Sequence, residues 1–228
     1  MLRSPRENDA SESQDRAPMN SSAEFPPDAF RRIDEEDDTR FYAFPRKVVH
    51  IDEGAIAALG RLYAEILPPA GVLLDLMASW RSHLPQEFRA QVIGLGLNRD
   101  EMADNPQIFQ AVVQDVNRNP HLPFADEAFD GAMCAVSVQY LIRPVELFGE
   151  VRRVLKPGAP FIVSFSNRCF PDKAVALWRA ANDEQHIKIV AVYFRASGGW
   201  TDPTADAHTP PGGDPLYAVS AFKAPKVE

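Results

Sequence analysis

The amino-acid sequence predicts a doubly wound α/β domain whose sheet has seven mostly parallel strands. Short apolar runs alternate with amphipathic helical segments along most of the chain. These runs are too continuously apolar to leave one face in water, which is typical of parallel strands covered on both faces by helices. No helix is expected between the last two strands, at 187–195 and 216–222. They should therefore form a hairpin, in which one strand runs antiparallel to the rest.

The elements follow from the hydrophobic pattern. Asp52 is a typical N-cap for a helix over 56–66, which Pro68 and Pro69 end. The turn at Pro157 and Gly158 leads one helix directly into the next strand. The expected strands are 72–74, 91–97, 111–114, 129–138, 161–165, 187–195 and 216–222, and the expected later helices are 99–104, 145–155 and 172–181.

Three segments differ in composition. Residues 1–38 are polar and acidic and are expected to form a disordered tail, with an acidic interaction arm as the alternative. Residues 39–70 bring aromatic and apolar side chains and are expected to form a lid segment and a helix before the sheet. Residues 71–228 should form the α/β domain.

Composition excludes several classes of protein. The chain has 228 residues, of which 45% are hydrophobic and 25% charged, so the chain can build a core. A net charge of −8 disfavours nucleic acid and anionic lipid as partners. No apolar run approaches the ~18 residues that span a bilayer, and no secretory h-region begins the chain. With only two cysteines, Cys134 and Cys169, and no metal-ligand spacing among the histidines, we expect a cytoplasmic protein without disulfides or a metal.

Polar residues stand where the predicted parallel strands end. They are Asp75 after the first strand, Asn98 after the second, Asp115 after the third, and Ser137, Gln139 and Tyr140 after the fourth. In an open doubly wound sheet, ligands bind beyond the carboxyl ends of the strands where strand order reverses. These residues are therefore expected to converge on one ligand site.

The order of elements and several local motifs resemble class I S-adenosylmethionine-dependent methyltransferases of the type 11 kind. The motifs are Asp75 at the end of the first strand, the Leu-Pro-Phe-Ala-Asp-Glu-Ala-Phe-Asp run at 122–130, and Arg-Val-Leu-Lys-Pro-Gly at 153–158. The resemblance implies a Rossmann-like fold, S-adenosyl-L-methionine as cofactor and methyl transfer to a small-molecule acceptor. It further implies that the cofactor is bound by Asp75, Met77, Ser79, Leu97, Asn98, Asp115, Val116, Ala135 and Val136.

The sequence departs from this family at two places. Met77, Ser79 and Arg81 stand where the family has the three glycines that let the backbone approach the cofactor. Gly96 stands where the family has an acidic residue for the ribose hydroxyls, and Asn98 is the substitute that the resemblance suggests. The alternative to an enzyme is therefore a non-catalytic member of the fold that acts as a binding or scaffold subunit. A nicotinamide-dependent oxidoreductase is a third option, but no G-x-G-x-x-G follows a strand.

The lid segment supplies candidate catalytic residues. Tyr42, Arg46 and His50 are spaced four apart and would share a face if the segment were helical, although Pro45 opposes a helix. Arg46 would suit an acceptor carboxylate or phosphate, and His50 would suit a general base. Tyr140 is the third candidate, after the fourth strand. Both residues also have a structural alternative. Arg46 would form an ion pair with the nearby acidic run, and His50 would donate a hydrogen bond to a backbone carbonyl.

Overall fold

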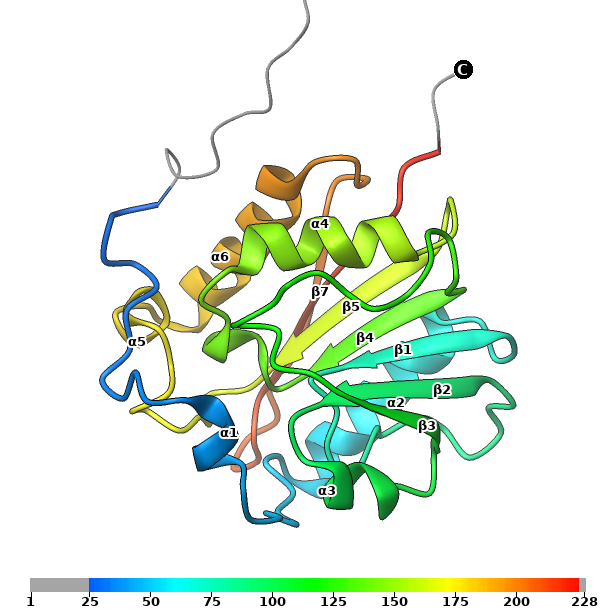
Figure 1. Cartoon of the computed structure of the whole chain (residues 1–228), viewed down its shortest axis with the longest axis horizontal. Coiled ribbons are helices and arrows are strands. Elements are labelled where there is room, and N and C mark those ends of the chain that lie inside the picture. Colours follow the sequence, from blue (N-terminus) through cyan, green and yellow to red (C-terminus); the bar gives the residue numbers. More distant parts are fainter. Residues whose placement is uncertain (1–24, 226–228) are drawn as a thin grey trace, which may run out of the picture.

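The computed structural model describes residues 25–225, which form one seven-stranded sheet with helices on both faces (Figure 1). The strand order is β3-β2-β1-β4-β5-β7-β6, and β7 is antiparallel to both neighbours. This confirms the predicted fold class, including the antiparallel C-terminal hairpin. The strands are β1 (Val72–Leu76), β2 (Gln91–Gly96), β3 (Ile108–Val113), β4 (Gly131–Ala135), β5 (Pro160–Phe165), β6 (Thr204–His208) and β7 (Leu216–Phe222).

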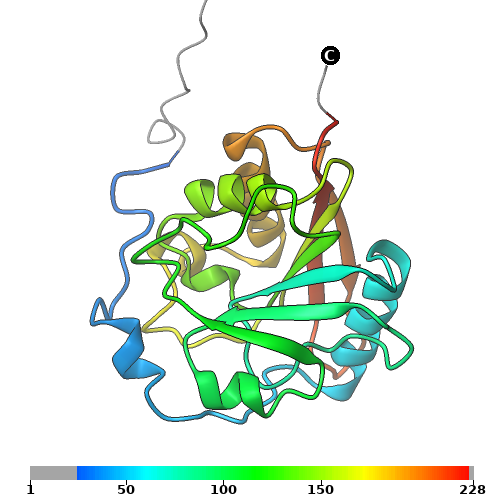
Figure 2. The same cartoon turned by 45° about the vertical axis from the view of Figure 1, so that its right-hand side comes forward.

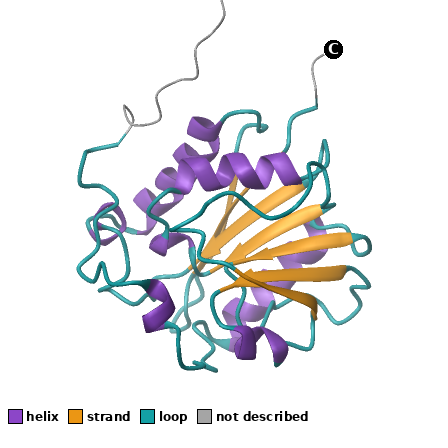
Figure 3. Cartoon of the chain, in the orientation of Figure 1, coloured by secondary structure: helices purple, strands orange, loops and turns teal. Residues whose placement is uncertain are grey.

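The longest helices pack on opposite faces of this sheet (Figures 2 and 3). One face carries α4 and α6, and the other carries α2. Asp52 caps α2 through its side chain, as predicted. The helices are α1 (Asp38–Phe41), α2 (Glu53–Ile66), α3 (Arg99–Ala103), α4 (Pro144–Val154), α5 (Ala176–Arg179) and α6 (Asp183–Ser197), with a 3₁₀ turn at Val138–Tyr140.

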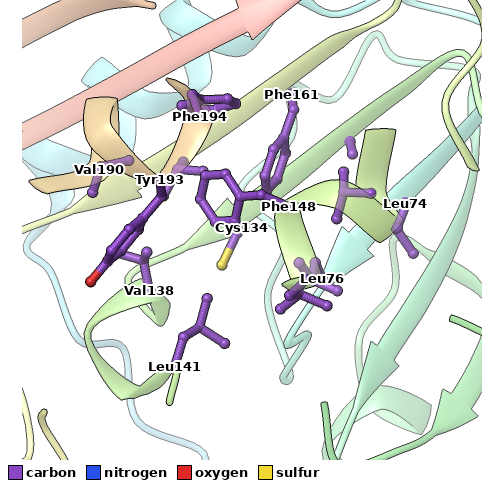
Figure 4. Close-up of a cluster of buried hydrophobic side chains, with 14 of the residues drawn as sticks. Leu74, Leu76, Cys134, Val138, Leu141, Phe148, Phe161, Val190, Tyr193 and Phe194 are labelled. Carbon is purple, nitrogen blue, oxygen red and sulfur yellow. The ribbon is translucent and has the colours of Figure 1, made fainter. Parts of the chain in front are cut away.

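The larger core lies between the sheet and the pair α4 and α6 (Figure 4). Phe148 of α4 contacts Tyr193 and Phe194 of α6 edge to face, with ring centroids 5.7 and 4.8 Å apart. Cys134 of β4 lies within this cluster, and burial raises the pKa of its thiol, so it is a core thiol rather than a nucleophile. This packing fixes the sheet whose strand ends form the site.

The predicted strand at 187–195 is wrong, because these residues belong to α6. Asn182 and Gln185 form a reciprocal capping box that starts the helix, and the buried residues His186, Val190, Tyr193 and Phe194 repeat at helical spacing. The sixth strand is instead Thr204–His208. Its side chains are mostly exposed, as befits an edge strand, so it lacked the apolar signal that marks the other strands.

Two other predicted elements are shorter than expected. The predicted helix 172–181 is reduced to α5, because the backbone N–H groups of Val175, Ala176 and Leu177 donate outside it, to Gln139, Arg31 and Ala29. The strand predicted at 129–138 ends at Ala135, because Val136 adopts a φ of 44° and the chain then turns.

The structure also differs from the predicted tail. Residues 25–38 pack on the domain: Phe25 and Phe30 contact Tyr193, and Asp38 is buried. Ala176 and Leu177 donate backbone hydrogen bonds to this segment, which explains its position. The rest of the predicted tail, residues 1–24, lies outside the described residues.

Candidate functional site

A cavity lies where the strand order reverses, beyond the carboxyl ends of β1, β2, β3 and β4. It holds about 1170 Å³ of space not filled by atoms, its open mouth included, which is on the scale of a small-molecule site. The residues expected to bind the cofactor or to act in catalysis all line it: Arg46, His50, Asp75, Met77, Ser79, Leu97, Asn98, Asp115, Val116, Ala135, Val136 and Tyr140. Of the other strand-end residues, Ser137 lines it and Gln139 does not.

The loop after β1 keeps a glycine-like backbone without glycine. Met77 has a φ of 57°, which a residue with a Cβ adopts at a cost of roughly 1–3 kcal/mol. Arg81 does not fill the cavity: its guanidinium donates to the Asp104 carbonyl and lies over the Trp80 ring, 3.9 Å from the ring centroid. The residues that replace the expected glycines therefore leave the cavity open.

The same loop explains why Gly96 replaces an acidic residue. A Cβ on Gly96 would lie 2.2 Å from the Ala78 carbonyl oxygen, so no side chain fits there. The Ala78 N–H donates to the Leu95 carbonyl, which holds the loop against the end of β2. The side chain expected at this position is excluded by backbone contact.

Asn98 and Glu101 take the neighbouring positions. The Asn98 side chain caps α3 by accepting from the Glu101 N–H and also donates to the Tyr42 carbonyl at 2.8 Å. Glu101, which the sequence analysis missed, is buried against the cavity and accepts from the Ser79 hydroxyl at 2.6 Å and from the Arg46 N–H. Its position in the first turn of a short polar helix was the available signal.

Asp75 lies buried at the cavity floor. Its Oδ2 accepts from the Ser82 hydroxyl at 2.6 Å, and Ser82 also accepts from Asn105. Burial raises the pKa of Asp75 to about 7, and the Ser82 hydrogen bond opposes this rise. The carboxyl group is therefore close to half-protonated at neutral pH.

Asp115 lies at the end of β3 with one oxygen committed. Its Oδ1 accepts from the backbone N–H groups of Asn117 and Arg118, and no described residue is bonded to Oδ2. Partial burial raises the pKa of this carboxyl, against those two hydrogen bonds. The second oxygen can accept a hydrogen bond from a ligand.

The lid candidates line the cavity without forming a helix. The helix α1 ends at Phe41, before Tyr42, Arg46 and His50, so their shared face comes from a folded loop rather than from helical spacing. The Arg46 guanidinium lies 3.8 Å from the centroid of the Phe41 ring and donates to the Phe41 carbonyl. The predicted alternative, a pair between Arg46 and the acidic run, does not form among the described residues.

Two imidazoles face the cavity near one another. The His50 ring contacts Phe170 edge to face, with centroids 5.4 Å apart, and His83 comes from the loop after β1. Neither ring has a hydrogen-bond partner within residues 25–225, so the predicted His50 bond to backbone is absent. Burial lowers the pKa of His50 and lowers that of His83 to about 4, helped by Arg81, so both rings are neutral at pH 7. No motif in the sequence predicts His83 at this position.

The residues after β4 have unequal roles. The Tyr140 hydroxyl accepts from the Phe170 N–H at 2.9 Å, and burial raises the Tyr140 pKa to about 12. Gln139 points away from the cavity and donates to the Val136 carbonyl. Tyr140 therefore positions Phe170 at the site, and Gln139 is structural.

A buried ion cluster fastens residues 29–46, here called the N-terminal strap, over the cavity. Lys173 lies 3.0 Å from Asp34 and 3.2 Å from Asp38, and Asp38 also pairs with Arg32. Asn117 donates to Asp38 as well, which joins the strap to the loop after β3. Among the described residues, no group of three or more His, Cys, Asp and Glu side chains is arranged to hold a metal.

The fold and the cavity define a doubly wound α/β protein with a ligand site at its topological switch point. Residues 78–163 match the model of a methyltransferase domain. A malonyl-[acyl-carrier protein] O-methyltransferase of Marinomonas is 26% identical over 141 residues, which is 61% of this chain and 45% of that protein. A biotin biosynthesis bifunctional protein of Teredinibacter turnerae is 36% identical over 66 residues, 29% of this chain and 12% of that protein.

Among solved structures, a SAM-dependent methyltransferase from Archaeoglobus fulgidus superposes with a TM-score of 0.55 at 17% identity. The match covers 75% of this chain and 94% of that one. The match to a methyltransferase domain and the shared fold agree with the resemblance to class I S-adenosylmethionine-dependent methyltransferases. It spans between 12% and 54% of the length of the four curated relatives that it matches.

Proposed function

We propose that the protein transfers the methyl group of S-adenosyl-L-methionine to a small-molecule acceptor. The observation that carries this proposal is the single cavity wall formed by the strand-end residues Asp75, Asp115 and Ala135 at the switch point of a methyltransferase fold. The match of residues 78–163 to a methyltransferase domain supports the cofactor. The free oxygen of Asp115 would accept from the adenine amino group, and Asp75 would lie beside the methionine moiety.

The reaction needs little chemistry from the protein. The sulfonium of the donor supplies the methyl group, and the thioether leaves without an acid. Holding the nucleophile and the methyl carbon in line can contribute ~7–11 kcal/mol. A base is needed for hydroxyl or ammonium acceptors, and the neutral His50 ring can serve.

Calorimetric titration with S-adenosylmethionine and S-adenosylhomocysteine tests the cofactor. We expect the parent to bind both, and Asp115→Ala to bind both about tenfold more weakly, since a hydrogen bond to a charged group is lost. No heat at high micromolar cofactor would instead support a non-catalytic binding or scaffold role.

Arg46→Ala tests whether Arg46 acts on the acceptor rather than on the cofactor. We expect cofactor affinity to remain that of the parent, because the Arg46 contact to Glu101 is made by the backbone N–H. Turnover with an accepted substrate should fall. If Asp115→Ala and Arg46→Ala both behave like the parent in both assays, the cofactor and the acceptor lie elsewhere.

A further inference from the structure

Two apolar side chains at the cavity are open to solvent. Val48 and Val49 line the cavity, yet their exposed fractions are 51% and 44%. Phe44, four residues before Val48, is 81% exposed. Large exposed apolar side chains grouped at a cavity mark a binding surface, whereas isolated ones need no explanation.

This apolar segment is held in place. The Trp80 indole N–H donates to the Val48 carbonyl at 2.9 Å, and the Arg46 N–H donates to the buried Glu101. The two bonds join residues 46–48 to the loop after β1 and to α3. The apolar side chains are therefore part of a built entrance to the cavity.

The loop after β1 positions His83 at considerable cost. His83 has a φ of 59°, a left-handed conformation that a side chain disfavours. Ser82 on one side is bonded to Asp75, and Leu84 on the other exchanges two hydrogen bonds with the Gln107 side chain. Neighbours on both sides thus fix an imidazole that itself has no partner among the described residues.

The charges near the two rings are largely committed to the protein. Arg81 donates to two carbonyls, and Lys173 is paired with Asp34 and Asp38. The groups that face His50 are Glu101 and Arg46, and those that face His83 are Arg81 and His50. A cationic acceptor would meet the guanidinium groups of Arg46 and Arg81. An uncharged acceptor with a hydroxyl can contact the two neutral rings and the exposed valines.

We propose that the methyl acceptor is a largely apolar molecule with a weakly acidic hydroxyl, such as a phenol or an enol, and that one imidazole of the pair His50 and His83 accepts its hydroxyl proton. This inference rests on the proposed function. The hydroxyl hydrogen-bonds to an imidazole nitrogen. As the oxygen lone pair forms the bond to the methyl carbon, the carbon–sulfur bond breaks, its electrons remain on sulfur, and the proton passes to the imidazole.

Binding of fluorescent naphthalenes to the protein saturated with S-adenosylhomocysteine tests the substrate class. We expect 2-naphthol to bind at least tenfold more tightly than 2-naphthyl phosphate. Val48→Asp and Val49→Asp should weaken 2-naphthol binding about tenfold, and Phe109→Asp, at an even more exposed apolar site at the start of β3, should not. Equal or tighter binding of the phosphate, or parent-like affinity of both valine variants, would overturn the proposal.

The role of the imidazoles has a separate readout. 2-Methoxynaphthalene has the same ring system without a hydroxyl donor, so the parent should prefer 2-naphthol by about fivefold to tenfold. The double variant His50→Phe/His83→Phe should lose this preference while still binding S-adenosylhomocysteine, which also checks that it is folded. If it does not fold, the single variants are compared.

A preference that persists in these variants would refute the proton-acceptor role. If the parent binds S-adenosylhomocysteine but none of the naphthalenes, the acceptor class is wrong and the proposed function stands. If it does not bind S-adenosylhomocysteine, both proposals fail together.

Discussion

At the residue scale, the site is dominated by burial of groups that carry charge in water. Asp75, Glu101 and Lys173 are all buried, and each is stabilised by named partners rather than by solvent. Asp75 has the weakest support, a single hydroxyl, and burial raises its pKa. The consequence is a pH dependence that can be measured.

Asp75 should make the fold less stable as the pH rises from about 4 to about 7. Its pKa is near 3.8 when unfolded and about 7 when folded, so in this range the folded state holds the extra proton. Its contribution to the free energy of unfolding then falls by about 1.4 kcal/mol per pH unit and is constant above pH 7.

Urea unfolding of the parent and Asp75→Asn between pH 5 and pH 8 checks this. The difference in unfolding free energy between the two proteins should change by about 1.4 kcal/mol per pH unit up to pH 7 and stay constant above it. Groups with lowered pKa values, such as Asp130, are present in both proteins and cancel in the difference. A pH-independent difference would show that Asp75 is ionised in the folded protein.

At the element scale, the start of α6 decides whether residues 187–195 form a strand or a helix. Residues 187–195 are rich in branched apolar residues, which favours a strand, but the capping box at Asn182 and the buried spacing from His186 onward favour a helix. Contacts with α4 make the helical arrangement the one that fills the core. Local capping and tertiary packing together override the strand propensity.

Asn182→Ala should lower the free energy of unfolding by about 1 kcal/mol, because the N–H of Gln185 loses its acceptor. Asn182→Ser should retain most of the stability, since a hydroxyl can also cap. Urea denaturation with equal m-values measures both. An alanine variant as stable as the parent would mean that packing alone holds this helix end.

At the scale of the whole molecule, the strap couples the N-terminal segment to the ligand site. Lys173 joins Asp34, Glu36 and Asp38, and Arg118 pairs with Asp37.

No helix among residues 25–225 has the length and apolarity to cross a membrane.

Lys173→Met should loosen the strap, because its removal leaves Asp34 without a counter-charge and the buried Asp38 with Arg32 alone. Hydrogen exchange of residues 34–46 should become at least tenfold faster, and S-adenosylhomocysteine should dissociate faster. Lys188→Met removes an exposed i,i+4 pair with Glu184 and serves as the control. Unchanged exchange in Lys173→Met would show that the backbone contacts of the strap suffice.

The sequence by itself determined the class of fold, because apolar runs, caps and turns are local signals, and it identified most of the strand-end residues that surround the cavity, with Gln139 as the exception. Only the tertiary structure decided what those residues do there. Asn98 proved to be a cap, Glu101 and His83 came into the cavity from segments without a motif, and Ala78 showed why Gly96 cannot carry a carboxylate. Such roles depend on contacts between residues distant in the chain, which neither periodicity nor composition encodes.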